Sequence, residues 1–443
     1  MNTYKNFLVV EAAAPAVDTH IKTHLSHLED LAIERGLDGF NNFLEHINEM
    51  IEKIRGFETN QEINAKIDGS PMILFGLDPR KEFKNKFFLS LKGGLSKANP
   101  KILHTEADIE ALYGTHPIKS KLKNMLKFLP SAYDNSGKIY QADTLFAEPT
   151  DKKKIKIGEE EFIAFKPNVI VYAVPVDPTS EISKRISAAV VGIIVHESFK
   201  GVQEGEGINL ISAGRNVASL VQKSKRTNVF IESSNYGQVA VNIPDGEVRK
   251  LQSEVAKAKI AIGRVTPEFN KEYISSPVLA LLKIFLNKQV DLGEKGFFGI
   301  AKQNIEAGEQ ELVVNSFIDN FRRFISERYG KEGELKKTPQ GKANVETRLN
   351  QILSFLELSK KSIAGLIAAT FHMTASKYYL WNILSKFESK LGRQFYQNKD
   401  GSFTPARDEG YVLFVGTNHV KIVDRLDFTK INRAEGGRQR TTI

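Results

Sequence analysis

The spacing of apolar residues changes three times along this chain, and these changes constrain its fold more than any other feature. Apolar residues recur at helical spacing to about residue 60, at strand-like spacing over 61–245, and at helical spacing again to about residue 400. Short strand-like runs then return over 401–430. The pattern predicts an α+β chain whose largely antiparallel sheet is interrupted by a helical insertion and then resumed.

Domain boundaries follow from the same pattern. We expect an N-terminal helical segment at 1–60, a β-rich core at 61–245, a helical insertion at 246–400, the final core strands at 401–430 and a basic tail at 431–443. The first segment has the pattern of a helical hairpin that turns at residues 36–39. His20, His24 and His27 share one face of its first helix, and we interpret them as surface or core histidines because no acidic cluster follows to complete a metal site.

Individual elements are predicted within these segments. Strands are expected at 71–77, 86–91, 138–146, 161–165, 169–174, 188–195, 410–414 and 419–423, where apolar or alternating runs lie between Gly, Pro and Asp. Helices are expected over 106–129, with breaks at Gly114 and Pro117, and at 248–262, 276–290, 306–329, 343–356 and 363–391. The polar segment 330–341 is expected to be a mobile linker.

Composition excludes several classes of protein. The 443 residues contain no cysteine, which excludes disulfides, thiolate zinc sites and cysteine nucleophiles. No run approaches 18 apolar residues and no signal-peptide layout is evident, so we expect a cytoplasmic protein. The net charge of +9 favours a polyanionic partner, and residues 80–127 carry 11 basic against four acidic side chains. The alternative for the lysines of 119–127 is the solvated face of a helix.

The tetrapeptide Lys66-Ile67-Asp68-Gly69 is the strongest chemical signal, and the apolar run 72–75 follows it. A lysine at a strand-to-turn junction acts as a covalent nucleophile when its amine is neutral, a state that desolvation or a neighbouring cation favours. Taken alone, the motif also fits a solvated lysine before an ordinary Asp-Gly hairpin turn.

Other motifs in order along the chain make the set resemble the covalent nucleotidyltransferase superfamily of DNA ligases, RNA ligases and mRNA-capping enzymes. Residues 66–69 resemble motif I, whose lysine becomes nucleotidylated. Residues 90–94 resemble the basic-glycine element that follows it, with Lys92 where arginine is common. Residues 139–146 resemble motif III, with Asp143 where glutamate is usual. Phe165 or Tyr172 would be the aromatic residue that stacks on the purine, and ordinary core packing is the alternative for both.

Two further matches lie near the C-terminus. Residues 409–414 resemble motif IV, Glu-Gly-x-Val, and residues 420–423 resemble motif V, whose lysine contacts the α-phosphate. The insertion between motifs IIIa and IV is longer than in most members of the superfamily. The resemblance implies Lys66 and Lys421 as catalytic residues; Asp68, Gly69, Lys92, Phe165, Tyr172 and Glu409 as nucleotide-binding residues; and Asp143 and Glu409 as metal ligands.

The resemblance also implies a fold and an activity. The fold would be an antiparallel-sheet nucleotidyltransferase core of the ATP-grasp-like ligase type. The activity would be ATP- and Mg²⁺- or Mn²⁺-dependent joining of polynucleotide 5′-phosphate and 3′-hydroxyl ends through lysyl-AMP. An RNA ligase is favoured because only 18 residues follow Arg425, too few for the OB-fold domain of DNA ligases.

The sequence also suggests a class of source and leaves two alternative functions open. Residues 4–11 resemble the N-termini of many tailed-bacteriophage proteins, which suggests an enzyme of RNA repair in the host cytoplasm. The first alternative is an inactive nucleotidyltransferase-fold protein that binds nucleic acid or belongs to the virion. The second keeps the covalent step but transfers the nucleotide to a protein or small molecule. The sequence also leaves NAD open as the nucleotide donor.

Overall fold

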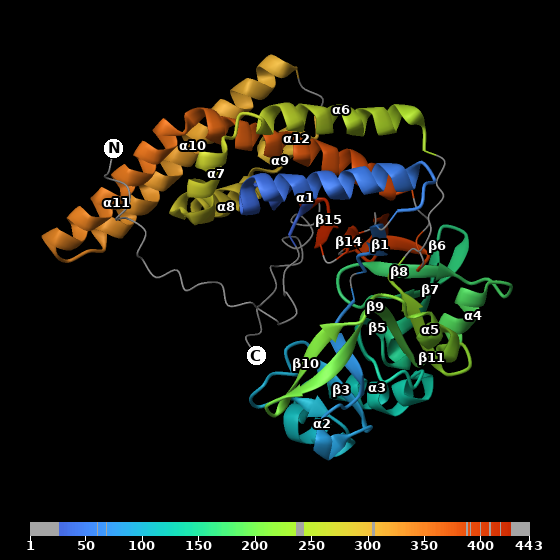
Figure 1. Cartoon of the computed structure of the whole chain (residues 1–443). Helices are drawn as coiled ribbons and strands as arrows, with labels where there is room; N and C mark the ends of the chain where they lie inside the picture. The colour runs from blue at the N-terminus through green and yellow to red at the C-terminus, as the bar shows by residue number, and fades with distance from the viewer. Residues whose placement is uncertain are drawn as a thin grey trace. The chain divides into compact units, whose positions relative to one another are not determined.

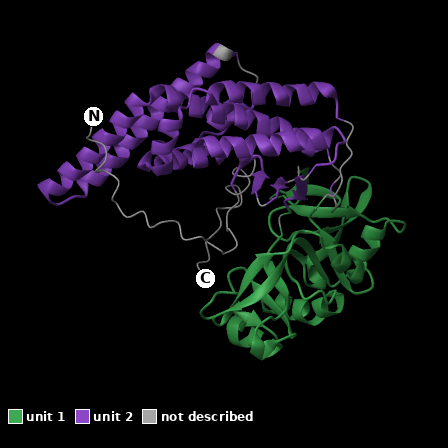
Figure 2. Cartoon of the chain, in the orientation of Figure 1, with its two compact units in different colours: residues 1–25, 67–235, 391–406 green, residues 26–66, 236–390, 407–443 purple. Residues whose placement is uncertain are grey.

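The structure is a computed structural model, and two compact units make up the described part of the chain (Figures 1 and 2). It describes residues 26–59, 61–67, 69–235, 243–303, 306–386, 389, 391–398, 400–406, 409–416 and 418–426. Within these ranges, unit 1 comprises 67–235 and 391–406, and unit 2 comprises 26–66, 243–389 and 409–426. The prediction of a mixed helix-and-strand chain with antiparallel sheets is confirmed.

Unit 1 is built around a seven-stranded sheet with the order β10-β9-β5-β2-β3-β4, in which β11 also pairs with β9. Its strands are β2 (Met72–Leu77), β3 (Phe87–Leu91), β4 (Ile102–Leu103), β5 (Ile139–Phe146), β9 (Val191–Glu204), β10 (Gly207–Ser212) and β11 (Val229–Ser233). Only the β9–β11 pair of this sheet is parallel within the described residues. The sheet joins segments that are distant in the sequence, since β5 pairs with β9.

A second, five-stranded sheet of unit 1 has the order β13-β12-β8-β7-β6 and is antiparallel throughout. Its strands are β6 (Lys152–Ile157), β7 (Glu160–Phe165), β8 (Val171–Pro175), β12 (Arg393–Gln397) and β13 (Phe403–Pro405). The helices of the unit are α2 (Glu106–Tyr113), α3 (Lys119–Ala132), α4 (Glu181–Ala188) and α5 (Ala218–Ser224), with short 3₁₀ turns η2 (Lys81–Phe83) and η3 (Pro149–Asp151). Apolar residues of α3, including Leu122 and Met125, pack with Ile73 and Tyr140 of the larger sheet.

The strands predicted for this unit are confirmed as β2, β3, β5, β7, β8 and β9, although β9 continues to Glu204. The helices predicted over 106–129 are confirmed as α2 and α3. The prediction missed β4, β6 and β10 to β13. β6 shows why, since four of its six residues are lysines, a composition that an edge strand tolerates because its outer side faces solvent.

Unit 2 is mainly helical and carries a three-stranded antiparallel sheet, β1-β14-β15. The strands are β1 (Gln61–Ala65), β14 (Tyr411–Val415) and β15 (Asn418–Ile422). The helices are η1 (Leu28–Asp30), α1 (Leu31–Ile54), α6 (Asp245–Ile262), α7 (Pro267–Ser275), α8 (Pro277–Gln289), η4 (Val290–Lys295), α9 (Phe297–Ala301), α10 (Ala307–Glu334), α11 (Pro339–Leu358) and α12 (Lys360–Leu384). The predicted strands at 410–414 and 419–423 are confirmed as β14 and β15.

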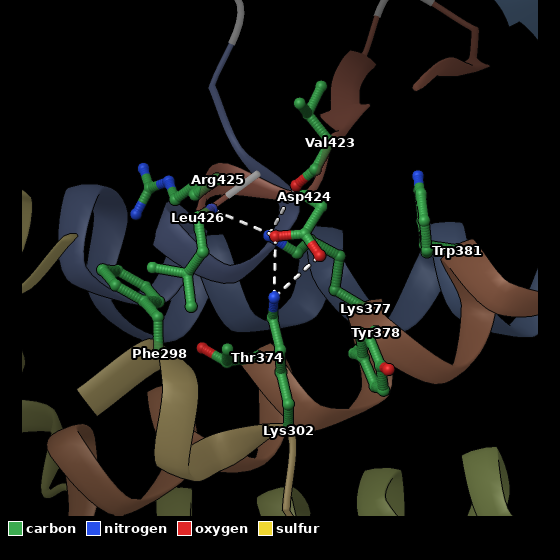
Figure 3. Close-up of a pocket in the computed structure, with 10 residues that line it drawn as sticks. All are labelled: Phe298, Lys302, Thr374, Lys377, Tyr378, Trp381, Val423, Asp424, Arg425 and Leu426. Carbon is green, nitrogen blue, oxygen red and sulfur yellow. Dashed lines mark hydrogen bonds and ion pairs between the residues drawn. The ribbon is translucent and has the colours of Figure 1, made fainter. Parts of the chain in front are cut away.

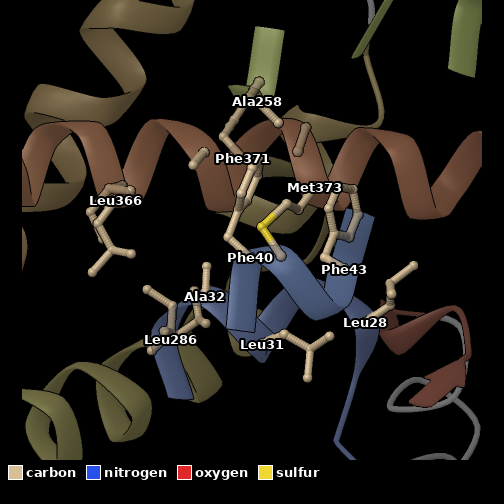
Figure 4. Close-up of a cluster of buried hydrophobic side chains, with 14 of the residues drawn as sticks. Leu28, Leu31, Ala32, Phe40, Phe43, Ala258, Leu286, Leu366, Phe371 and Met373 are labelled. Atoms are coloured by element: carbon tan, nitrogen blue, oxygen red, sulfur yellow. The ribbon is translucent and has the colours of Figure 1, made fainter. Parts of the chain in front are cut away.

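Helix α12 is the centre of unit 2, since most of its residues are buried on every side. Phe371 and Met373 of α12 pack with Phe40 and Phe43 of α1 in one hydrophobic cluster (Figure 4). Ala258 of α6 belongs to the same cluster. A helix that is apolar all round is stable only inside a core, so α12 requires the other helices around it.

One prediction for the helices of unit 2 is confirmed in part, and another is wrong in detail. The break expected at 36–39 lies at Gly36, where two helical segments of α1 meet at non-helical backbone (φ +57°, ψ −132°) and the next amide, Leu37 N–H, donates to Asn270 Oδ1 at 2.9 Å. The positive φ suits glycine. The expected mobile linker is mostly helical, because α10 runs to Glu334 and Thr338 caps α11 by accepting from Gly341 N–H at 3.1 Å.

Candidate functional site

Three residues singled out from the sequence meet on the small sheet of unit 2. β14 is the central strand, paired with β1 on one side and β15 on the other. Lys66 directly follows β1, Glu409 lies two residues before β14, and Lys421 lies within β15. The backbone N–H of Lys66 donates to the carbonyl of Gly410 at 2.8 Å. The end of β1 therefore lies beside the start of β14.

Lys66 and Glu409 form an ion pair, although 343 residues separate them in the sequence. The Glu409 side chain is only 5% exposed, and that of Lys66 is 31% exposed. Glu409 Oε1 accepts from the Lys66 ammonium, whereas Oε2 is buried and has no hydrogen-bond partner within the described residues. Because a buried carboxylate oxygen without a partner is costly, Oε2 marks a place for a further donor or cation.

Lys421 supplies a second cation to the same sheet. It lies opposite Val412, which lies opposite Asn64 on the other side of β14. Cross-strand partners point to the same face of a sheet, so the side chains of this row share one face. Burial lowers the pKa of Lys421, and the positive charge of Arg425 lowers it further. Within the ranges that the structure describes, the Lys421 ammonium has no ion-pair partner.

The opposite face of the sheet is apolar. Ile63 of β1, Leu413 of β14 and Val420 of β15 belong to the hydrophobic cluster that also contains α12. The alternation of core and polar positions along each strand is that of a half-buried sheet. The core thus fixes the face on which the two lysines stand.

His27 and Asn64 also belong to the polar face, although no motif of the sequence marks either of them. His27 lies in extended backbone before η1, so the expectation that it stands on a helix face with His20 and His24, which lie outside the described residues, is wrong. His27 forms a parallel bridge with Lys421, and the Lys421 N–H donates to the carbonyl of Ser26 at 2.9 Å. Asn64 is 2% exposed, and its Oδ1 is buried without a hydrogen-bond partner in the described ranges. Strand alternation was a usable signal for Asn64, which stands two residues before Lys66. No local signal places His27 beside β15.

A buried ionic cluster lies next to this sheet, formed by Glu29, Asp30, Lys377 and Arg425. Lys377 Nζ donates to Glu29 Oε1 at 2.5 Å, and Arg425 Nη1 donates to Asp30 Oδ1 at 3.0 Å. Burial alone would raise the pKa of Glu29, but the charges of Lys377 and Arg425 outweigh it, so the net shift is downward. The cluster anchors the segments before α1 and after β15 to α12.

A small pocket, with room for little more than one water molecule, adjoins this cluster (Figure 3). Lys302 Nζ lies 2.7 Å from both carboxylate oxygens of Asp424 across the pocket and 5.4 Å from the ring centre of Tyr378. Lys377 Nζ also donates to the carbonyl of Val423 at 3.0 Å. Because its cations are already engaged by carboxylates, we interpret this pocket as support for the C-terminal segment.

In unit 1 the structure brings together Gly69 and Asp143. A Cβ added to Gly69 would lie 2.5 Å from the Asp143 Cβ, so only glycine fits against this aspartate. Asp143 Oδ2 lies 3.1 Å from His196 Nε2. His196 occupies the irregularity in the β5–β9 pairing, where Gln141 pairs with Glu197 and Ala142 with Val195. Such a bulge redirects a side chain, and sequence periodicity does not reveal it.

The remaining predicted site residues occupy separate positions of unit 1. Lys92 is exposed just after β3, and its backbone N–H donates to the carbonyl of Met72 at 3.3 Å. Phe165 and Tyr172 are 2% and 0% exposed, and their rings stack with centroids 5.7 Å apart. Both rings are thus packed in the interior of unit 1. Asp68 lies outside the described residues, as do residues 4–11 and the basic tail.

A family model matches residues 22–435, a range that includes both units and every candidate residue named above. The matching model is that of a family of unknown function, DUF6267. The chain belongs to this family. No curated protein and no solved structure matches it. The matching family has no assigned function, so a function for this chain can be inferred only from the geometry of the site.

The charge distribution and the absence of a ready-made metal site in the described residues limit the ligands that this DUF6267 chain could bind. In unit 1, Lys119 and Lys123 pair with Glu110, and Lys121 pairs with Asp151. Local carboxylates thus offset much of the basic run 119–127. Over the part of the chain that the structure describes, no three His, Asp or Glu side chains form a group able to hold a metal ion. No helix in that part has the length and apolar character needed to span a bilayer.

Proposed function

We propose that the protein is an ATP-dependent polynucleotide ligase, with RNA favoured as the substrate, that acts through a lysyl-AMP intermediate. The observation that carries the proposal is the meeting of Lys66, Glu409 and Lys421 on one sheet. Lys66 comes from one motif, whereas Glu409 and Lys421 come from two others that lie at least 343 residues further along the chain. The nucleotidyltransferase core and the cytoplasmic setting are parts of the same proposal.

The covalent step requires Lys66 to act as a nucleophile. Its ε-amine would attack the α-phosphorus of ATP, so that a P–N bond forms, the bond from the α-phosphorus to the bridging oxygen breaks, and pyrophosphate leaves. The Lys66 ammonium must lose one proton before it can attack, and the nitrogen loses a second one as the P–N bond forms; both protons pass to solvent. The AMP would then pass to a polynucleotide 5′-phosphate, and attack by a 3′-hydroxyl would form the phosphodiester and release AMP.

The neighbouring residues suit this chemistry. Lys421 is a partly buried cation without an ion pair in the described ranges, and it stands on the face where Lys66 emerges. A cation in a low-dielectric position stabilises the negative charge that develops on phosphoryl oxygens. Glu409 holds the Lys66 ammonium through Oε1 and thereby fixes the position of the amine before reaction. The ion pair between Lys66 and Glu409 must break when the nucleotide binds, so that the amine can reach the α-phosphorus.

A divalent cation fits one of the two predicted ligands better than the other. Glu409 has a buried oxygen without a partner in the described residues, and Mg²⁺ prefers carboxylate oxygens together with substrate phosphates and water. Asp143 already has His196 as a partner. We therefore expect Glu409 to hold the ion. When bound, Mg²⁺ would neutralise charge on the triphosphate.

One observation favours a non-catalytic alternative. In this structure the Lys66 ammonium is engaged by the Glu409 carboxylate, an arrangement that a purely structural ion pair would also produce. On that reading the chain would bind nucleic acid without forming an adduct. Salt-sensitive nucleic-acid binding without any labelled intermediate would support it.

The decisive experiment is adduct formation. Purified protein would be incubated with α-³²P-labelled ATP and Mg²⁺ and then analysed by denaturing gel, followed by acid and alkali treatment of the label. We expect an acid-labile, alkali-stable adduct that is lost in Lys66→Ala and strongly reduced in Lys421→Ala. Lys283→Ala is the matched control, since Lys283 forms an exposed ion pair with Glu34 in the same unit.

Substrate tests follow from the adduct. Unlabelled 5′-phosphorylated RNA and DNA strands would be added to the labelled protein, and transfer of label to each strand would be compared. RNA-dependent discharge of the label supports the favoured acceptor. A label that persists in Lys66→Ala, or the absence of any adduct with ATP, GTP or NAD, contradicts the proposed activity.

A further inference from the structure

His27 stands in a row of four residues that crosses the polar face of the small sheet. The row runs from His27 to Lys421, Val412 and Asn64, as the bridge and the two strand registers define. Adjacent strands are about 5 Å apart, and cross-strand partners share a face. Lys66, two residues after Asn64, emerges on the same face. His27 is therefore an immediate neighbour of Lys421.

Three buried polar atoms at this face lack partners within the described residues: His27 Nδ1, Asn64 Oδ1 and Glu409 Oε2. Nearly all buried polar atoms in proteins are hydrogen-bonded, so such a concentration at one place is unusual. Oε1 of the Glu29 carboxylate lies 3.9 Å from His27 Nδ1, too far for a hydrogen bond. The face thus has unused hydrogen-bonding capacity.

The composition of this face indicates what ligand would satisfy it. The Lys421 ammonium calls for an anion, whereas the oxygens of Asn64 and Glu409 call for hydrogen-bond donors or a cation. A nucleotide offers both, because it combines phosphate oxygens with hydroxyl and amino groups. Inorganic phosphate would satisfy Lys421, but it has no amino groups or sugar hydroxyls to donate to the two acceptors.

The imidazole of His27 is electrically neutral in this setting. Burial lowers its pKa well below the usual value, and the charges of Arg425, Lys377, Lys421 and Lys66 lower it further. A neutral imidazole carries one N–H, which acts as a donor, and one unprotonated nitrogen. It can thus donate one hydrogen bond to a phosphate oxygen without carrying a charge of its own.

We propose that His27 is a phosphate-binding residue of this site and donates its imidazole N–H to a non-bridging phosphate oxygen of a nucleoside triphosphate held by Lys421. The inference rests on the proposed function for the identity of the nucleotide, but it concerns binding and not the covalent step. On this proposal His27 belongs to the nucleotide site and is not an ordinary surface or core histidine.

The test separates binding from chemistry. Binding of α,β-methylene-ATP, which cannot transfer AMP by cleavage between its α- and β-phosphorus atoms, would be measured by titration calorimetry with the full chain. We expect His27→Ala to weaken this binding about 10- to 100-fold, the range for a hydrogen bond to a charged group. His27→Gln, which retains an N–H donor, should recover most of the affinity. Adenosine, which lacks phosphate, should have the same affinity for His27→Ala as for the wild type.

A second histidine of the same sheet provides the matched control. His419 lies on β15 opposite Phe414, with ring centres 5.8 Å apart. We expect His419→Gln to bind α,β-methylene-ATP within about twofold of the wild type, as its substitution removes no donor from the row. If His27→Ala does not fold, as judged by circular dichroism, His27→Phe replaces it because the ring volume is retained.

The possible outcomes distinguish this inference from the proposed function. Wild-type affinity in a folded His27→Ala or His27→Phe overturns the inference, even if the lysyl adduct forms normally. Loss of affinity in those variants with no adduct in the wild type supports the inference and contradicts the ligase. A wild-type protein that does not bind the analogue at millimolar concentration overturns the inference.

Discussion

Replacing Lys377 by methionine should destabilise unit 2 severely. Lys377 is 5% exposed, and its Nζ donates to Glu29 Oε1 at 2.5 Å and to the carbonyl of Val423 at 3.0 Å. Glu29 is fully buried. Removing one member of a buried ion pair leaves the other charge without compensation and costs about 3–5 kcal/mol of unfolding free energy. We expect Lys377→Met to fall in that range.

Arg425 cannot take over the role of Lys377. Its Nε lies 3.4 Å from Glu29 Oε1, but its guanidinium is already hydrogen-bonded to Asp30. One cation would then face two buried carboxylates. The double variant Glu29→Gln/Lys377→Met removes both charges of the broken pair, so we expect it to be more stable than Lys377→Met, although it carries one more substitution.

Urea unfolding followed by tryptophan fluorescence measures this effect. Trp381, the single tryptophan of the chain, is 3% exposed on α12, one helical turn after Lys377, so it reports on this part of unit 2. Lys386→Met is the control, because Lys386 pairs with Glu247 while 43% exposed, and such pairs contribute about 1 kcal/mol at most. A loss below about 1 kcal/mol in Lys377→Met, or a double variant less stable than that single variant, would refute the reasoning.

Three further predictions concern titration, close packing and helix termination. Burial raises the pKa of Asp30 to about 6, so its contribution to stability is complete below its unfolded pKa of about 4 and is lost as the pH rises through 6. Asp30→Asn removes this dependence, and its unfolding free energy relative to the wild type should rise between about pH 4 and pH 7, as measured by urea titration at each pH. Gly69→Ala places a Cβ 2.5 Å from the Asp143 Cβ and should cost about 1–3 kcal/mol in thermal unfolding, whereas Gly246→Ala, with no atom within 4 Å of the added Cβ, should cost none. Lys152 Nζ donates to the carbonyls of Ile186 at 2.7 Å and Ala189 at 2.5 Å at the end of α4, so Lys152→Met should cost about 1–2 kcal/mol by the same assay, and an unchanged transition would exclude a role in ending this helix.

Local patterns in the sequence were sufficient for most regular elements. The alternating runs at 71–77 and 138–146 became β2 and β5, and the hairpin at the C-terminus became β14 and β15. Residue spacing predicts such elements because the periodicity of a strand or a helix is already visible within about five to twenty consecutive residues. The same local motifs identified Lys66 and Glu409 as candidates.

Local patterns failed where the environment decides the structure. The lysine-rich β6 lacks the apolar run that predicted the other strands, and it is a strand because it pairs with β7 at the edge of a sheet. The break at Gly36 was expected from the sequence, but its partner was not, since Asn270 of α7 accepts from the adjacent Leu37 amide, a contact made across 233 residues. Both features depend on partners that are distant in the sequence.

The sequence by itself determined the order of the strongly periodic elements, the absence of cysteine chemistry and the choice of Lys66, Glu409 and Lys421 as candidates. Only the tertiary structure paired β1 with β14, joined Lys66 to Glu409 and placed His27 beside Lys421. The reason is physical. Periodicity records which face of a segment is apolar, whereas the choice of neighbour depends on which apolar faces close together into one core, and that choice is made by the whole chain.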